Sequence, residues 1–266
     1  MIAAETTSPD APPAAAQALT RGLEVLRVVS EARQPITSTE IARRVGLHQS
    51  WVSRVLKTLS LAGYVRKPDY HSFAVDYGVL TLGGNAQHQF PYMTRPKKAM
   101  EVIAERCDGL NVALATLWRG QLIYFMRTQK GHEPVGLSVG FPLHLSSVAM
   151  RLLLDIPKTQ ALEALRESKR RYGWERGTEQ VARTPEEVLE FAKSSLRHDC
   201  VVLQGYYQPR LLGCAIPVQA EGEPPAALAL SGPMSLYRVD DVLLMLQQGR
   251  REVEAAMRST HQAVRK

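Results

Sequence analysis

Apolar side chains recur at helical spacing near the start of the chain. Leu23, Leu26 and Val29 follow one another every three residues, which places them on one face of a helix. Thr20 is expected to cap this helix, because threonine side chains accept hydrogen bonds from free N–H groups at helix starts. The helix is expected to end just before Pro35, since the residue preceding a proline disfavours helical backbone.

Two further helices follow, with clear start and stop signals. Thr37 and Glu40 have the spacing of a capping box, in which each side chain satisfies a free backbone N–H of the other residue. Gly46 then ends the second helix. A third helix is expected over 49–62, with Gly63 after it. The side chains predicted to face the core of these two helices are Ile41, Ala42, Val45, Val52, Val55, Leu56 and Leu59.

After Gly63 the pattern changes from helical spacing to short strands. Residues 64–67 and 73–75 read as two strands, and Pro68 and Asp69 supply a turn between them. Two strands after three helices are typical of the wing of a winged helix-turn-helix. The sequence therefore predicts a DNA-binding domain in the first third of the chain.

The spacing within 37–59 meets the physical demands of a helix-turn-helix. Ala42 is small enough for the helices to cross there, and Gly46 allows left-handed backbone in the turn. Val52 and Val55 attach the third helix to the second. The side chains expected to face DNA are Gln49, Ser50, Trp51, Ser53, Arg54 and Lys57 on the third helix, with Arg66 and Lys67 at the entry to the wing.

Each of these side chains has a chemical role that suits DNA. Gln49 and the serines can hydrogen-bond base edges in the major groove, whereas Arg54 and Lys57 suit phosphates one turn further along. The alternative is a structural three-helix domain with a solvated basic face. Trp51 in particular has a second interpretation as a packing residue, and Ser53 as a merely exposed one.

Charge supports the DNA-binding interpretation. Residues 37–67 contain six Lys or Arg against one acid, Glu40, and the whole chain has a formal net charge of +7. A basic balance suits a polyanion, which is either nucleic acid or an anionic membrane surface. No stretch is long and apolar enough to cross a bilayer, so nucleic acid is the favoured partner.

The second half of the chain mixes helices and strands. The expected helices are 97–106, 146–154, 157–167, 185–198 and 239–259, and the expected strands are 111–118, 121–128, 135–139, 201–203, 212–218 and 226–231. This grouping indicates an α+β domain rather than a regular βαβ repeat. The predicted organisation is a disordered tail over 1–18, a winged helix-turn-helix domain over 19–80, a linker helix over 81–94 and a further domain over 95–259.

The chain resembles the IclR family of bacterial transcription regulators over nearly all of 19–258. The segments that carry the resemblance are RGLEVLRVVSE, STEIARRVGL, SRVLKTLSLAGYV and DYGVLTLG in the first half, then RPKKAMEVIAERCDGLNVALATLWRGQLIYFMRT, VGFPLHLSS, CAIPV and LALSGP in the second. The resemblance implies a winged helix-turn-helix, a linker helix and an effector-binding domain similar to GAF-type sensors. It also implies homodimers, or dimers of dimers, on palindromic operators, and effectors that are small organic acids.

The resemblance further implies where an effector would bind. The matching positions are Leu145, Ser146, Ser147, Gln204, Tyr206, Tyr207, Gly213, Cys214 and Ser231. Ser146 and Ser147 stand at a predicted helix start, where free N–H groups favour a carboxylate. The alternative is that these serines only cap the helix.

Several positions depart from the family pattern. Ala149 and Met150 stand where the family has a Gly-Lys pair, and the usual acidic run before the later strand is replaced by residues that include Tyr206 and Tyr207. A less acidic and more aromatic site favours an aromatic carboxylate, with a ring packed on tyrosine faces and Gln204 fixing an oxygen. The alternative is that both tyrosines pack in a core or a dimer interface.

An enzyme is the competing class of function. His144 and Cys214 could form a base and a nucleophile, but no nucleophile elbow or phosphate loop accompanies them. We expect His144 to be a structural hydrogen-bonding residue and Cys214 a buried apolar one. The three cysteines have no metal-ligand spacing, so neither a metal nor a cofactor is expected, and reduced thiols indicate the cytoplasm. The chain start lacks the basic flank and apolar run of a signal peptide.

Overall fold

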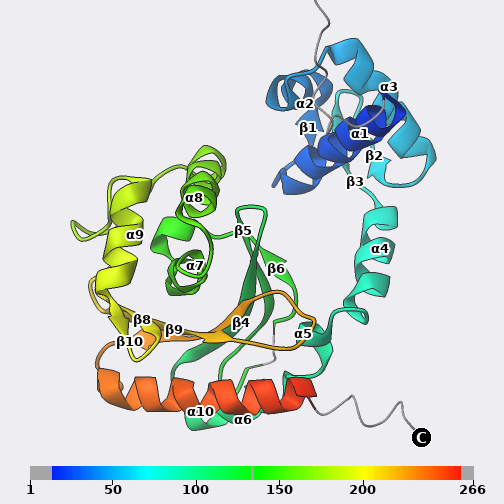
Figure 1. Ribbon diagram of the computed structural model, residues 1–266. Coiled ribbons are helices and arrows are strands. Elements are labelled where there is room, and N and C mark those ends of the chain that lie inside the picture. Colours follow the sequence, from blue (N-terminus) through cyan, green and yellow to red (C-terminus); the bar gives the residue numbers. More distant parts are fainter. Residues whose placement is uncertain (1–13, 133–134, 259–266) are drawn as a thin grey trace, which may run out of the picture. The chain divides into compact units, whose positions relative to one another are not determined.

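The computed structural model describes residues 14–132 and 135–258. They form two compact units that divide between Gln87 and His88, and each unit has a sheet and helices of its own (Figure 1).

The first unit is a three-helix core with a small sheet and one further helix. Its elements are α1 Ala14–Glu31, β1 Ile36–Thr37, α2 Ser38–Val45, α3 Gln49–Leu61, β2 Val65–Arg66, β3 Ser72–Val75 and α4 Tyr77–Gln87. β3 pairs antiparallel with β1 on one side and with β2 on the other. The predicted wing is therefore present. β1 was not predicted, because a strand of two residues has no periodicity that its sequence could reveal.

The ends of these helices correct the prediction in two places. α1 begins by Ala14, before the expected cap Thr20, because an alanine-rich stretch has high helix propensity. Of the expected tail, residues 1–13 lie outside the described residues. The expected linker helix over 81–94 is two helices, α4 and α5 Pro91–Thr94, because Pro91 cannot continue a helix but suits the start of a new one.

The capping box of α2 is half formed. The Thr37 hydroxyl accepts a hydrogen bond from the Glu40 N–H at 3.3 Å, as predicted. The Glu40 carboxylate, however, accepts hydrogen bonds from Arg43 at 2.7 Å and Arg44 at 2.8 Å. These side-chain hydrogen bonds lower the pKa of Glu40 to about 2. Gly46 ends the helix with a φ of 66°, the left-handed conformation that the turn needs.

The second unit is a seven-stranded antiparallel sheet with helices on both faces. Its strands are β4 Asn111–Trp118, β5 Gln121–Thr128, β6 Ser138–Val139, β7 Leu196–Arg197, β8 Cys200–Gln204, β9 Leu211–Val218 and β10 Ala226–Pro233, in the order β6-β5-β4-β10-β9-β8-β7. Its helices after α5 are α6 Lys97–Arg106, the 3-10 turn η1 Leu143–Leu145, α7 Ser147–Leu153, α8 Lys158–Tyr172, α9 Pro185–Ser194 and α10 Val239–Arg258. This is the α+β architecture that the sequence predicted.

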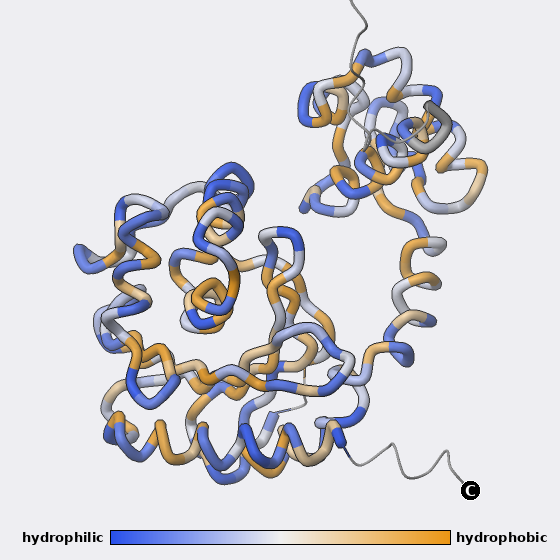
Figure 2. The backbone as a smooth tube through the Cα atoms, in the orientation of Figure 1, coloured by the Kyte–Doolittle hydropathy of each residue, from blue (hydrophilic) through white to orange (hydrophobic). Residues whose placement is uncertain are grey.

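Two apolar layers lie on the two faces of this sheet. α6 and α10 cover one face, and their layer includes Ile103, Leu228 and Leu246. α7 covers the other face, with α8 and α9 outside it, and Figure 1 shows these two sets of helices on opposite sides of the strands. Figure 2 shows apolar residues concentrated in the strands and in α7, while α10 alternates between apolar and polar positions.

A β-bulge in β5 changes which side chains face each layer. Leu114 of β4 pairs with Met126, but the next residue, Ala115, pairs with Tyr124, so Phe125 is an extra residue. Phe125 and Met126 consequently both face the α6–α10 layer. Beyond the bulge, each side chain of β5 faces the layer opposite to the one that strict alternation would give it, which is the usual effect of one extra residue.

A buried arginine fixes the position of α7. Arg151, whose side chain is 7% exposed, donates hydrogen bonds to the Asp199 carbonyl at 2.8 Å and to the Asp199 carboxylate at 2.6 Å. Asp199 and His198 form the two-residue turn between β7 and β8, both with positive φ. The last turn of α7 is thereby attached to the β7–β8 turn at one edge of the sheet.

Candidate functional site

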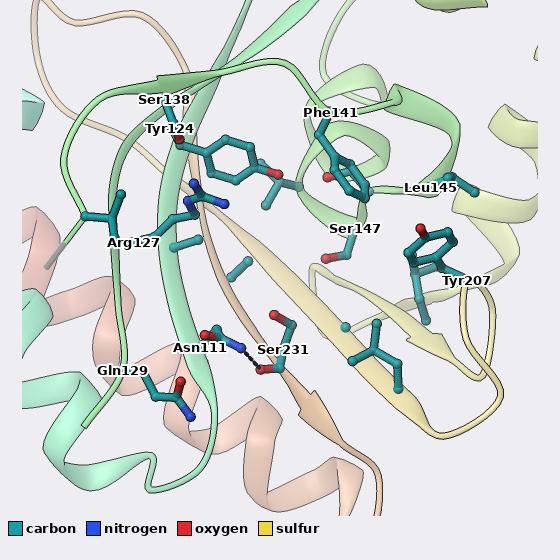
Figure 3. Close-up of a pocket in the computed structure, with 18 of the residues that line it drawn as sticks. Asn111, Tyr124, Arg127, Gln129, Ser138, Phe141, Leu145, Ser147, Tyr207 and Ser231 are labelled. Carbon is teal, nitrogen blue, oxygen red and sulfur yellow. Dashed lines mark hydrogen bonds between the residues drawn. The ribbon is translucent and has the colours of Figure 1, made fainter. Parts of the chain in front are cut away.

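A cavity of about 620 Å³ lies between the sheet and the start of α7. Strands β4, β5, β9 and β10 form its floor, and the segments around Phe141 and Tyr207 form one side (Figure 3). A cavity of this size, lined mainly by apolar side chains with a few polar groups, is typical of small-molecule sites.

The structure brings most of the predicted effector residues together around this cavity. Seven of them line it: Leu145, Ser146, Ser147, Tyr206, Tyr207, Gly213 and Ser231. Figure 3 shows the Ser147 and Ser231 side chains pointing into the space between the walls. Asn111 also lines the cavity, and its side-chain N–H donates to the Ser231 carbonyl at 3.5 Å.

Two predicted residues lie elsewhere, which corrects their assignment. Cys214 follows Gly213 on β9, and strand alternation turns it into the layer under α6 and α10. Gln204 follows Leu203 on β8, so it also turns away and lines a separate surface hollow with Arg238. The sequence placed both residues near the correct segment but on the wrong face.

The start of α7 is capped by the protein itself. The Ser146 hydroxyl accepts a hydrogen bond from the Ala149 N–H at 3.2 Å. Ser146 therefore has the simple capping role that was the alternative to effector binding. The Ser147 hydroxyl is the one that faces the cavity, and a Cβ placed on Gly213 would lie 3.4 Å from it.

The two tyrosines differ in how far their hydroxyl and ring already have partners within the protein. Tyr206 is 1% exposed, and its hydroxyl accepts a hydrogen bond from the Ala182 N–H at 3.0 Å. Tyr206 also packs against Phe191, so it is largely a core residue, which was the alternative for it. Tyr207 is half-buried and meets Phe141 edge to face, with ring centroids 6.1 Å apart. Phe141 and Tyr207 form an aromatic wall of the cavity.

Sequence reasoning missed a polar group on the opposite wall. Arg127 and Tyr124 of β5 both line the cavity, and the guanidinium carbon lies 5.3 Å from the centre of the Tyr124 ring. None of the described carboxylates pairs with Arg127, and no Asp or Glu is among the lining residues. Burial raises the pKa of Tyr124, while a hydrogen bond with Ser146 opposes that shift.

His144 and Cys214 do not form a catalytic pair. The His144 ring is buried, stacks on Trp174 at 4.0 Å and bonds the Glu175 carbonyl through Nε2 at 2.8 Å. Burial lowers the pKa of His144 and raises that of Cys214 to about 12, so the thiol stays protonated. The two residues lie on opposite sides of the sheet.

The described residues meet neither the requirements of a metal site nor those of a membrane-spanning helix. No group of three or more His, Cys, Asp or Glu side chains gathers there in a way that could hold a metal ion. Among the described helices, none combines the length and apolar character required to cross a membrane.

The surface of α3 and the wing presents the residues predicted to meet DNA. Seven of the eight are exposed, and Trp51 is half-buried against the core of the first unit. Arg43 and Arg44 are paired with Glu40. By contrast, no described carboxylate pairs with Arg54, Lys57, Arg66 or Lys67. The free positive charge of this unit is therefore concentrated on α3 and the wing.

Two local contacts shape this surface. The Gln49 amide donates hydrogen bonds to the Thr39 hydroxyl at 2.9 Å and the Ser38 hydroxyl at 3.4 Å, which connects the starts of α2 and α3. Asp69 accepts hydrogen bonds from the His71 and Ser72 N–H groups at 2.8 and 2.9 Å. This arrangement forms the turn of the wing that Pro68 and Asp69 were predicted to supply.

Comparison with known proteins gives a match to the sequence model of the IclR helix-turn-helix domain over residues 18–69. The chain is also 24% identical to the p-hydroxybenzoate hydroxylase transcriptional activator of Acinetobacter baylyi over 253 residues, which cover 88% of this chain and 89% of that protein.

Solved structures of similar fold cover both units. An IclR family transcriptional regulator from Brucella abortus has a TM-score of 0.75 at 23% identity, over 94% of this chain and 96% of that one. An IclR homolog from Microbacterium hydrocarbonoxydans, solved in complex with 4-hydroxybenzoate, has a TM-score of 0.64 at 22% identity, over 91% of this chain and 100% of that one. These similarities confirm the predicted fold, a winged helix-turn-helix followed by an α/β domain.

Proposed function

Because the chain belongs to the IclR family of DNA-binding transcription regulators, we propose that a small aromatic carboxylate bound in the cavity of the second unit changes its affinity for operator DNA. The family consists of transcription regulators and not of enzymes. A regulator of transcription works where its operator is, so we propose the cytoplasm as its location.

One observation carries the choice of effector. The cavity has the aromatic wall of Phe141 and Tyr207 on one side and Arg127, which pairs with no described carboxylate, on the other, and none of its described lining residues is acidic. A ring packs well against aromatic faces, and an anion suits a site whose lining carries positive charge only. An aromatic carboxylate satisfies both walls at once. A short aliphatic acid would leave the aromatic wall without a partner.

Two relatives support the same class of effector. The Acinetobacter protein is named an activator of a p-hydroxybenzoate hydroxylase gene, and the Microbacterium homolog was crystallised with 4-hydroxybenzoate. Each statement concerns that relative, and neither identifies the effector of this chain. They make hydroxybenzoates the first compounds to test.

For DNA, we propose that α3 enters the major groove and that the wing contacts the flanking backbone. Arg54, Lys57, Arg66 and Lys67 are exposed and pair with no described carboxylate, so they suit phosphates. Ser53 is exposed and can meet base edges, whereas the Ser50 hydroxyl already bonds His48 Nδ1 at 3.0 Å and would have to exchange that contact. Effector binding would alter operator affinity if the two states of the protein bind the effector unequally.

We also propose that the chain works as a homodimer or a dimer of dimers. α4 is an apolar helix without a single buried residue, and Leu80 and Leu82 on it are 69% and 56% exposed. Exposed apolar side chains gathered on one helix mark a contact surface. In sedimentation velocity at micromolar concentration, we expect wild-type protein to sediment as a dimer or larger.

The variant Leu80→Lys should shift the protein towards smaller species, because a charge is costly to bury in such a contact. Leu61→Lys is the matched control, since Leu61 is 82% exposed on α3. A monomeric wild type would contradict the proposed assembly. An unchanged Leu80→Lys distribution would contradict the role given to α4.

Calorimetric titration tests the effector proposal. We expect 4-hydroxybenzoate or a related benzoate to bind wild-type protein more tightly than glyoxylate or pyruvate, and to change its affinity for operator DNA. The variant Gly213→Leu should lose at least about tenfold in affinity, because its side chain would grow from the floor of the cavity towards Ser147. Its unfolding temperature and its DNA binding without effector serve as controls for folding. Tight binding of glyoxylate or pyruvate alone would contradict the proposal.

A further inference from the structure

We infer that Arg127 is the residue that recognises the carboxylate of the effector, so that the bound ligand lies with its acid group against β5 and its ring against Phe141 and Tyr207. This inference rests on the proposed function, and it adds the orientation of the ligand and the reason the site requires an anion.

The bulge in β5 is what brings Arg127 into the cavity. Tyr124 and Arg127 are three residues apart, and strict alternation would place them on opposite faces of the sheet. Because Phe125 and Met126 both face the α6–α10 layer, Arg127 returns to the face of Tyr124. Bulges that redirect a side chain are found preferentially beside functional sites.

The guanidinium is available to a ligand. Arg127 lies against the face of Tyr124, at 5.3 Å from the ring centre, and pairs with none of the described carboxylates. Figure 3 shows its guanidinium beneath the Tyr124 ring and directed into the cavity. A planar guanidinium supported by an aromatic face keeps two parallel N–H groups free for both oxygens of one carboxylate.

A second polar group beside it also lacks a partner. Ser138 of β6 pairs with Tyr124 across the strands, so its side chain is on the same face. The Ser138 hydroxyl is buried and has no hydrogen-bond partner among the described residues, although it lines the cavity. Buried hydroxyls are rarely left without a partner, so an oxygen of a ligand at this wall would satisfy it.

The two walls of the cavity differ in chemistry, and this difference defines one orientation for a bound benzoate. Figure 3 shows Tyr124, Arg127 and Ser138 on one side and Phe141 and Tyr207 on the other. The first side carries the positive charge and the unsatisfied hydroxyl, whereas the second is aromatic. A benzoate placed with its carboxylate at Arg127 directs its ring and the substituent opposite the carboxylate towards the aromatic wall.

The test compares an acid with its neutral ester. Binding of 4-hydroxybenzoate and methyl 4-hydroxybenzoate is measured by calorimetry near neutral pH, where the acid is ionised, on wild-type protein, Arg127→Gln and Arg127→Lys. We expect wild-type protein to bind the acid at least about tenfold more tightly than the ester. Arg127→Gln should remove this preference by weakening the acid and leaving the ester unchanged, and Arg127→Lys should restore it in part.

Arg119→Gln is the matched control. Arg119 stands in the same second unit, with its guanidinium carbon 5.3 Å from the centre of the Trp118 ring, but it does not line this cavity. This variant should keep the wild-type preference for the acid.

Three outcomes would overturn the inference. If wild-type protein binds the acid and the ester equally, or if Arg127→Gln keeps the preference for the acid, Arg127 does not recognise the carboxylate, while the effector site itself stands. If wild-type protein binds no aromatic acid, both the proposed function and this inference fail.

Discussion

Replacing Arg54 and Lys57 together by alanine is expected to lower affinity for operator DNA about a hundredfold for each chain bound. Each side chain is exposed on α3, and neither pairs with a described carboxylate. A phosphate contact by such a cation contributes about a factor of ten, so two lost contacts multiply. Because phosphates are the same in every sequence, the loss should be similar on operator and on unrelated DNA.

Salt dependence identifies the cause of this loss. Cations that bind phosphates release counterions, so removing two contacts should lessen the slope of log affinity against log salt by about two for each chain. Electrophoretic mobility or fluorescence anisotropy titrations at several salt concentrations measure both quantities. An unchanged affinity and slope would show that α3 does not lie along the DNA backbone at these positions.

Arg43→Ala is the matched control for charge. Arg43 belongs to the same unit, but its guanidinium is bound to Glu40 at 2.7 Å. Removing it should change DNA affinity much less than removing Arg54 and Lys57.

Gln49→Ala is a different case, because the Gln49 amide already bonds Thr39 and Ser38. That variant should both relax sequence preference and loosen the start of α3.

Replacing Leu56 by alanine is expected to abolish DNA binding by unfolding the first unit. Leu56 is 0% exposed at the centre of the core that α1, α2 and α3 share. Truncating a buried leucine costs about 2–5 kcal/mol, because apolar contacts are lost and a cavity is left. A unit of this size is expected to have a free energy of unfolding of only about 5 kcal/mol, so most of its stability would be lost.

Thermal unfolding of the full chain by circular dichroism and calorimetry measures this effect. We expect the transition of the first unit to move to a much lower temperature, while titration with an aromatic acid still reports a folded second unit. Leu61→Ala removes the same atoms from the same helix at a site that is 82% exposed, and it should leave both transitions unchanged. If Leu56→Ala kept DNA binding and unfolding temperature, the packing of α3 would differ from that described.

The DNA-binding unit was determined largely by local sequence. Thr37, Gly46 and Gly63 fix where helices begin and end through hydrogen bonds and backbone conformations that involve only near neighbours. The spacing of Val52 and Leu56 fixes which side of α3 is buried, and therefore which side is exposed. In the second unit the same local signals predicted α6, β4 and β5 with their observed bounds.

The cavity of the second unit was decided by tertiary structure. Its walls come from strands and loops that are far apart in the sequence, and the face on which each side chain lies depends on strand pairing. The bulge at Phe125 exists only in the pairing of β5 with β4, yet it decides that Arg127 enters the cavity. Alternation along β8 and β9 likewise removed Gln204 and Cys214 from it. Helix ends follow from local chemistry. The face of the sheet on which a side chain lies depends instead on how its strand pairs with the neighbouring strands, and the sequence of one strand does not specify that register.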